Sequence, residues 1–280
     1  MKHGTTLTSI HPTAVIDDRA SVGAGVSVGP YAVIGPGVEI GDRTQIGPHV
    51  VVERDTRVGA ECRISAGAVL GTDPQDLKYV GERTWLEVGP RTVIREFATL
   101  NRGTAAAGLT VVGTDCLIMA YAHVAHDCRI GDHVVLSNAT NMGGHVEIGE
   151  WAVVGGVTAI HQFVRIGPHA MVGGASRISR DVAPYTLVAG NPAALYGINR
   201  IGLERRGFEA GTIDTLSRGF RDIFRSKTPL LEAVAAVPAD AADEVRAIAD
   251  FVAASERGIT TWARGVSDAS PASGVSPDGP

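Results

Sequence analysis

The chain has 280 residues, 44% of them apolar and 20% charged, with 35 Gly and a net charge of −5. This balance excludes a protein that is basic throughout and binds nucleic acid through its overall charge. The sequence holds no run of about 18 apolar residues, so no transmembrane helix is indicated, and its first residues lack the apolar stretch of a signal peptide. We therefore expect a cytoplasmic protein with no nucleic-acid partner and no membrane span.

A six-residue repeat dominates the sequence between residues 10 and 183. Ten hexads run from Ile10, two more start at Val88 and Ile94, and twelve run without a break from Val112. The first position of every hexad is Ile, Val, Leu or Met, and the fifth is a small residue. A helix with about 3.6 residues per turn cannot keep a six-residue register on one face, whereas a short strand followed by a tight corner can. The repeat therefore predicts a solenoid of short strands.

Three hexads of this solenoid close one triangular coil of 18 residues, and the coils stack through strand hydrogen bonds at about 4.8 Å. Large first residues fill the middle, small fifth residues point inward where space is narrow, and Gly and polar residues take the corners. Cys62, Cys116 and Cys128 all occupy fifth positions. We expect them to be buried core residues rather than catalytic thiols, metal ligands or a disulfide framework. The pattern resembles that of the hexapeptide-repeat acyltransferases, and this resemblance implies a left-handed parallel β-helix.

The hexads break twice and then stop after Pro184. The breaks, residues 71–87 and 101–111, interrupt a regular scaffold, and such loops often carry function. Beyond the hexads, apolar residues recur at helical spacing in 213–224 and again in 245–252. We therefore predict a mainly β protein with a small C-terminal α-helical domain. The expected boundaries are 1–190 for the β-helix, 191–264 for the helical domain and 265–280 for a disordered tail rich in Ser, Gly, Pro and Asp.

Four of the nine histidines gather on one face when the coils are stacked: His123, His126, His145 and His161. Gly144 follows His126 by 18 residues and therefore lies directly over it in the next coil. An imidazole suits a general base for a hydroxyl, Asp127 could orient it, and the Gly144 N–H could hold an oxyanion. Several histidines could instead bind zinc. The histidines at fourth positions outside this stack are expected to be solvated corner residues: His49, His133 and His169.

Four short motifs carry a closer resemblance. They are Gln-Asp-Leu-Lys-Tyr at 75–79, Ala-His-Val-Ala-His-Asp-Cys at 122–128, Ala-Ile-His-Gln-Phe at 159–163 and Arg-Arg-Gly-Phe at 205–208. Together they resemble the UDP-N-acetylglucosamine O-acyltransferase family over residues 8–262. That resemblance implies transfer of a (3R)-hydroxyacyl chain from acyl carrier protein to the 3-hydroxyl of UDP-N-acetylglucosamine, the first step of lipid A biosynthesis. It also implies a homotrimer with sites between subunits, no cofactor and no metal ligand.

The resemblance also implies roles for individual residues. His126 is the general base, Asp127 orients it, and the Gly144 backbone N–H stabilises the oxyanion. The expected substrate-binding residues are Asp76, Lys78, His123, His145, His161, Gln162, Gly174, Asn199, Arg205 and Arg206. For Arg205 and Arg206 the residue types themselves support a binding role, because adjacent guanidinium groups suit phosphates and acidic partners.

Several positions bear on specificity. Gly174 lies where the family sets acyl length, and a glycine there leaves the groove long. Gln75 fits members that use the 3-hydroxy sugar rather than a 3-amino sugar. Ile201 stands where an acidic residue is expected, and Pro192 replaces a histidine found in some members. Three alternatives stay open: a zinc hydratase resembling γ-carbonic anhydrase, acylation of a 3-amino UDP-sugar, and a non-catalytic binding scaffold.

Overall fold

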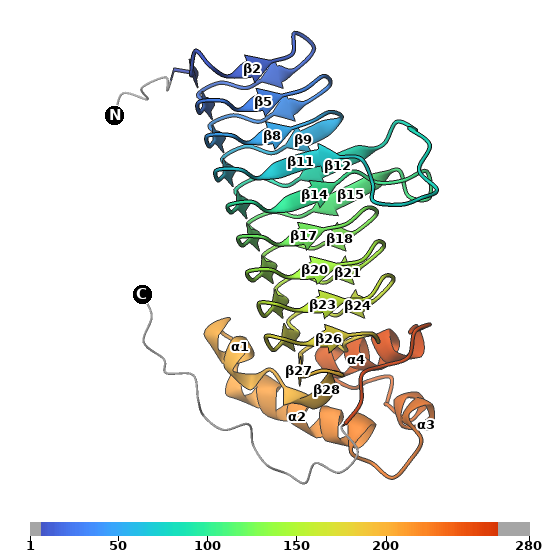
Figure 1. Ribbon diagram of the computed structural model, residues 1–280. Helices are drawn as coiled ribbons and strands as arrows, with labels where there is room; N and C mark the ends of the chain where they lie inside the picture. Colours follow the sequence, from blue (N-terminus) through green and yellow to red (C-terminus); the bar gives the residue numbers. More distant parts are fainter. Residues whose placement is uncertain (1–6, 263–280) are drawn as a thin grey trace, which may run out of the picture.

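The computed structural model describes residues 7–262, which form a left-handed parallel β-helix followed by a group of helices (Figure 1). The fold class predicted from the hexads is confirmed. The tail expected at 265–280 lies outside the described residues. Between residues 7 and 262, no helix has the length and apolar character needed to cross a membrane.

The strands form three long sheets, one on each side of a triangular prism. Sheet 1 holds β1 (Ser9–Ile10), β4 (Ser27–Val28), β7 (Gln45–Ile46), β10 (Arg63–Ile64), β13 (Val93–Ile94), β16 (Leu117–Ile118), β19 (Val135–Leu136), β22 (Val153–Val154), β25 (Met171–Val172), β27 (Thr186–Ala189) and β28 (Ala194–Ile198). Sheet 2 holds β2 (Val15–Ile16), β5 (Val33–Ile34), β8 (Val51–Val52), β11 (Val69–Thr72), β14 (Thr99–Asn101), β17 (His123–Val124), β20 (Asn141–Met142), β23 (Ala159–Ile160) and β26 (Arg177–Ile178). Sheet 3 holds β3 (Ser21–Val22), β6 (Glu39–Ile40), β9 (Thr56–Val58), β12 (Trp85–Val88), β15 (Leu109–Val112), β18 (Arg129–Ile130), β21 (Glu147–Ile148) and β24 (Arg165–Ile166).

Three edges of the prism join these sheets, and each edge is named here by the two sheets it joins. The fourth residue of a hexad turns the corner with a positive φ, as at Asp127 (60°), His145 (60°) and Phe163 (64°). This conformation is uncommon for residues other than glycine. A hydrogen bond to the preceding coil offsets its cost: the N–H of His145 donates to His126 O at 3.0 Å, and the N–H of Phe163 donates to Gly144 O at 3.1 Å. The corners are therefore fixed by contacts between coils.

The interior of the prism matches the hexad pattern. First-position aliphatic residues and small fifth-position residues form one continuous buried core. The three cysteines are free thiols within it, as predicted. Burial raises the pKa of the Cys116 thiol to about 11 and that of the Cys128 thiol to about 12, so neither forms a nucleophilic thiolate at neutral pH.

Both breaks in the hexads leave the prism at edge 2–3, where the chain passes from sheet 2 to sheet 3 (Figure 1). Ile64 pairs with Ile94, so 30 residues separate equivalent positions (94 − 64) instead of 18, which is an insertion of 12. Ile94 pairs with Ile118, a separation of 24 (118 − 94) and an insertion of 6. The insertions project as loops 73–84 and 102–108, slightly shorter than predicted, while the core phase is kept.

The C-terminal part caps the prism. β27 and β28 pair antiparallel and close sheet 1, and four helices follow among the described residues: α1 (Arg200–Arg205), α2 (Ala210–Phe224), α3 (Leu230–Ala235) and α4 (Asp243–Ala253). The apolar face of α2 packs with α4 in a second core. The chain then returns to the prism, where Thr260 N donates to Asp181 O at 2.8 Å. This return brings residues 255–260 back to edge 2–3.

Candidate active site

The centre of the site is a histidine–aspartate pair at edge 2–3. His126 Nδ1 lies 2.8 Å from Asp127 Oδ2, and the two side chains are 13% and 0% exposed. Since the carboxylate accepts a hydrogen bond from Nδ1–H, the neutral imidazole carries its lone pair on Nε2. His126 is therefore held in the tautomer that can accept a proton from a substrate hydroxyl.

The Asp127 carboxylate is held on its other side by the short loop. Thr104 donates its backbone N–H to Oδ1 at 2.9 Å and its hydroxyl to Oδ2 at 2.7 Å. Burial by itself would raise the pKa of Asp127, but the hydrogen bonds from His126 and Thr104 outweigh it and the pKa is lowered. The carboxylate therefore stays ionised at neutral pH and can stabilise a protonated His126.

Gly144 lies against the His126 ring, as the 18-residue spacing predicts. A Cβ added at this glycine would meet His126 Cε1 at 2.4 Å, so only glycine fits beside the ring as it stands. At edge 3–1, the N–H at the same hexad position is capped in two coils by an aspartate one coil further on: Ala24 N by Asp42 and Thr114 N by Asp132. Gln162 takes that position above Gly144, and within the described chain no acceptor is bonded to the Gly144 N–H.

Two of the three further histidines expected here, His145 and His123, adjoin the pair. His145 Nε2 lies 3.6 Å from Asp127 Oδ2, and its ring stacks on Phe163 at 4.5 Å. His123 Nδ1 lies 2.7 Å from Thr99 Oγ1. Burial, followed by the charge of His126, lowers the pKa of His123, so this imidazole is neutral at pH 7.

His161 meets a residue that sequence reasoning missed. Its Nδ1 lies 3.2 Å from Nη2 of Arg257 and 3.1 Å from the carbonyl oxygen of Gln162. Arg257 also donates to Ser179 O. No local signal marks Arg257, because it stands 96 residues further along the chain than His161. Thr104 was missed as well, although it ends the run Asn-Arg-Gly-Thr that opens the second break.

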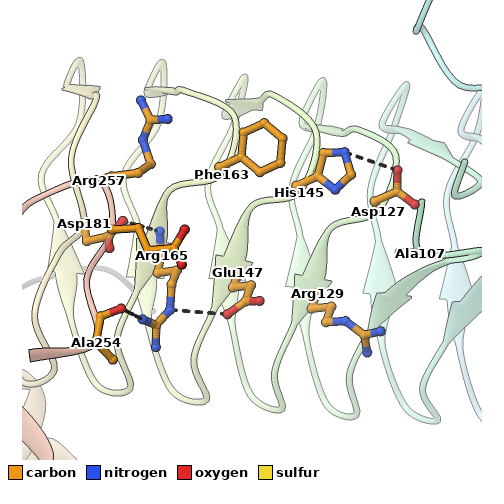
Figure 2. A pocket seen from close by; sticks show the side chains of 11 residues that line it. Ala107, Asp127, Arg129, His145, Glu147, Phe163, Arg165, Asp181, Ala254 and Arg257 are labelled. Carbon is orange, nitrogen blue, oxygen red and sulfur yellow. Dashed lines mark hydrogen bonds and ion pairs between the residues drawn. The ribbon is translucent and has the colours of Figure 1, made fainter. Parts of the chain in front are cut away.

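A groove of about 760 Å³ extends from this cluster along sheet 3 (Figure 2). Asp127, His145 and Phe163 lie along one side of it, and Arg257 lies at its far end. Its floor carries Arg129, Glu147 and Arg165, projecting from β18, β21 and β24. Arg165 Nε is 3.4 Å from Glu147 Oε2, and Arg165 Nη1 donates to Ala254 O at 3.3 Å. The groove is therefore polar, with fixed charges of both signs.

The long loop carries Asp76 and Lys78 at the same edge. The Lys78 N–H donates to Asp76 Oδ1 at 3.0 Å, and the Lys78 side chain makes no hydrogen bond or ion pair within residues 7–262. The fully buried Arg102 anchors the loop base through Gly71 O, the Asp73 carboxylate and Tyr79 Oη. Edge 2–3 thus carries the expected base, its partner, the glycine and the first loop.

The remaining predicted residues lie on other edges of the same protomer. Gly174 follows β25 at edge 1–2. Asn199 caps α1 by accepting from Gly202 N and donates to His169 O at 2.9 Å, so its amide is engaged within the chain. Arg206 lies over the Trp151 ring at edge 3–1, 5.5 Å from its centroid. Arg205 is exposed beside it at the end of α1.

The expectation that His169 is a solvated corner residue was wrong. Its ring stacks between Trp151 and Tyr185, with centroids at 6.4 and 5.4 Å, and Phe208 meets it edge-on. Burial, followed by the nearby Arg206 charge, lowers the pKa of His169 to about 4. Because α1 and the segment after it pack on this edge, the fourth-position imidazole becomes part of a ring stack.

The geometry of the histidine–aspartate pair also bears on the alternative that this site binds zinc. The possible ligand atoms of His126, Asp127 and His145 lie within 4.8 Å of one another. A hydratase of this fold needs three imidazoles, whereas this group offers two and a carboxylate whose oxygens already accept from Thr104 and His126. The donor set suits a proton-accepting imidazole better than a three-histidine zinc site.

Comparisons with known proteins agree with this geometry. A family model described as UDP-N-acetylglucosamine O-acyltransferase, domain 2, matches residues 181–260, and one for bacterial transferase hexapeptides matches residues 37–72 and 109–140. An acyl-[acyl-carrier-protein]–UDP-N-acetylglucosamine O-acyltransferase of Chlorobaculum parvum is 56% identical over 255 residues, covering 90% of this chain and 97% of the relative. One of the same name from Janthinobacterium sp. (strain Marseille) is 47% identical over 257 residues, covering 89% of this chain and 98% of the relative.

Solved structures show the same similarity as the sequence relatives. The structure of LpxA from Acinetobacter baumannii superimposes with a TM-score of 0.87 at 42% identity, covering 90% of this chain and 99% of that one. A UDP-N-acetylglucosamine acyltransferase from Campylobacter jejuni also gives a TM-score of 0.87, at 37% identity, covering 91% of this chain and all of that one. The agreement spans the β-helix and the helical cap together. The chain therefore belongs to the UDP-N-acetylglucosamine O-acyltransferase family.

Proposed function

We propose that this protein transfers a (3R)-hydroxyacyl chain from acyl carrier protein to the 3-hydroxyl of UDP-N-acetylglucosamine, the first step of lipid A biosynthesis. The observation that carries the proposal is the His126–Asp127 pair facing Gly144. It supplies a proton acceptor, a charge that stabilises the protonated acceptor, and a backbone N–H beside the reacting atoms. Membership of the family supports the choice of acyl donor and sugar.

The reaction follows from these three groups. His126 Nε2 takes the proton of the sugar 3-hydroxyl as that oxygen attacks the thioester carbonyl carbon. The carbonyl oxygen becomes an oxyanion, which the Gly144 N–H stabilises. The intermediate then collapses and breaks the carbon–sulfur bond, and His126 returns its proton to the departing thiolate. The products are the 3-O-acyl sugar nucleotide and the free thiol of the carrier protein.

The complete site requires more than one copy of the chain. Within a protomer, the base lies at edge 2–3, the phosphate-binding candidates Arg205 and Arg206 lie by edge 3–1, and Gly174 lies at edge 1–2. A homotrimer of parallel prisms would place edges of different copies beside one another. In solution we expect a species of about three times 29.1 kDa by light scattering, and a monomer that is fully active would contradict this assembly.

Mixed trimers test the shared site directly. His126→Ala and Arg206→Ala inactivate different edges, so each homotrimer should be inactive or weak. Co-expression of the two variants with different tags should give mixed trimers that regain part of the activity, because some sites then combine an intact His126 with an intact Arg206. Co-expression without recovered activity would place both residues in a site made by one protomer.

Specificity follows from the same placement. Gly174, at edge 1–2, adds no side chain where that edge would face edge 2–3 of another copy, so we propose a longer hydroxyacyl chain as the preferred donor. Gln75 favours the 3-hydroxy sugar. Asn199 caps α1 in the protomer and donates one N–H to His169 O, which leaves its second N–H and one oxygen lone pair for a nucleotide. We propose that the reaction uses no metal and no cofactor and takes place in the cytoplasm.

The test is acyl transfer by the purified protein. UDP-N-acetylglucosamine is offered with a panel of (3R)-hydroxyacyl carrier proteins of different lengths, and products are identified by mass spectrometry. His126→Ala should lower turnover by about 10²- to 10⁴-fold, the range for loss of a general base, with an unchanged melting temperature. No product from any donor would contradict the proposal and lead first to the 3-amino sugar and then to metal analysis.

A further inference from the structure

We propose that Thr104, on the short inserted loop, is a positioning residue for the acyl transfer, holding the Asp127 carboxylate so that it orients His126. This inference rests on the proposed function. The hydrogen bonds of Thr104 go to Asp127 and to its own loop and not to His126, so we expect it to act only through Asp127.

The contacts form one chain of hydrogen bonds. The Thr104 hydroxyl donates to Asp127 Oδ2 at 2.7 Å, and the same oxygen accepts from His126 Nδ1 at 2.8 Å. The Thr104 N–H donates to Oδ1 at 2.9 Å. Two donors from one residue, one on each oxygen, fix the rotation of the carboxylate about its Cβ–Cγ bond. The position of Oδ2, and with it the tilt of the imidazole, is then set by Thr104.

The same edge provides an internal comparison. Asp55 occupies the equivalent corner in an earlier coil, and its carboxylate accepts from the guanidinium of Arg83 at 2.9 Å. A cation held there compensates the carboxylate charge. Thr104 supplies neutral donors instead, so the Asp127 carboxylate is oriented without a fixed cation beside it that compensates its charge. A charge that is not compensated by a fixed cation can stabilise the imidazolium that forms when His126 accepts the proton.

Thr104 is itself held firmly. It is 7% exposed. On either side of it, Gly103 N donates to Trp85 O at 3.1 Å, and Ala105 N donates to Glu82 Oε1 at 3.0 Å. Trp85 and Glu82 belong to the far end of the long loop and the strand after it, so both insertions brace this residue. The six-residue insertion thus has a specific role: it delivers a hydroxyl and an N–H to a carboxylate in the next coil.

Thr104→Val tests the inference, because valine keeps the shape and the backbone N–H but lacks the hydroxyl. We expect kcat to fall by about 10- to 100-fold, in line with the cost of misplacing a catalytic group by up to about 1 Å, and KM to stay within about twofold. Thr104→Ser should restore most of the wild-type kcat. The acidic limb of the pH–rate profile should move to higher pH in Thr104→Val. Without the Thr104 hydroxyl, more of the negative charge on Asp127 Oδ2 is available to stabilise the protonated imidazole of His126. His123 and His145 flank His126 and are the same in both proteins, so the difference reports the Thr104 hydroxyl.

Thr44→Val is the matched control. The Thr44 hydroxyl also donates one hydrogen bond, to Gly59 O at 2.8 Å, and accepts one from a backbone N–H, that of Cys62 at 3.1 Å. It is fully buried in a regular coil remote from the site. We expect Thr44→Val to lower the melting temperature at least as much as Thr104→Val does, with kcat and the pH profile unchanged.

A double-mutant cycle separates positioning from a general structural effect. If Thr104 acts through Asp127, Thr104→Val should change kcat by less than about twofold when added to Asp127→Ala. Additive losses, equal losses in the valine and serine variants, or a wild-type kcat and pH profile in Thr104→Val would each overturn the inference. A wild-type protein without acyl transfer would refute the proposed function instead, so the two failures are distinct.

Discussion

Gly144→Ala should disable the base while leaving the oxyanion donor in place. An alanine Cβ would lie 2.4 Å from His126 Cε1 and 2.6 Å from Nε2, whereas ordinary contacts begin at 3.4 Å. The imidazole must therefore move by roughly 1 Å, and a misplacement of this size costs on the order of 10²-fold in rate. Movement also strains the 2.8 Å hydrogen bond from Nδ1 to Asp127. Because the φ of Gly144 lies outside the left-handed region, the backbone itself accepts alanine.

The assay is kcat for acyl transfer at saturating substrates, with the melting temperature measured in parallel. We expect kcat to fall about 100-fold and the protein to stay folded. Gly211→Ala is the control, because a Cβ there has no neighbour within 4 Å, and it should keep wild-type kcat. A Gly144→Ala enzyme within threefold of wild type would refute the reasoning, since it would mean that the ring moves without consequence for the proton transfer.

Three further predictions concern the loops and the helical cap. His169 has a pKa lowered to about 4 by burial, so the unfolded chain binds more protons than the folded one between about pH 6.5 and 4, and stability should fall as pH falls through this range. His169→Phe should flatten this dependence in chemical denaturation at pH 7 and pH 5, and an unchanged slope would place the acid sensitivity elsewhere. Lys78→Ala should raise KM for the sugar nucleotide with little change in melting temperature, and unaltered steady-state kinetics would remove the loop from the site. Arg102→Ala empties a fully buried position under the long loop, so it should lower the melting temperature and speed proteolytic cleavage within 73–84; equal cleavage rates would argue against Arg102 as the anchor.

Much of the site follows from sequence because the scaffold is periodic. The six-residue phase sets which residue occupies each edge, and a separation of 18 places Gly144 beside His126. The same phase identifies the cysteines as core residues, which the structure confirms. Because each regular coil has 18 residues, the number of residues between two positions tells whether their side chains are neighbours in adjacent coils.

The phase fails where the chain leaves the repeat. Counting residues leaves open whether the two breaks bulge outward, and the structure places both at edge 2–3, beside the histidines. His169 illustrates the same limit, since its surroundings come from residues after the last hexad.

The sequence alone determined the β-helix, the phase of its core and the pairing of His126 with Gly144. The tertiary structure alone decided which loops brace Asp127, which edge carries Arg206, and which residue meets His161. The reason is physical: the hexads encode contacts at a fixed spacing, whereas Thr104 and Arg257 reach the site through an insertion and a returning C-terminal segment. Those paths are set by packing between elements distant in the chain, and the repeat does not predict where such segments lie.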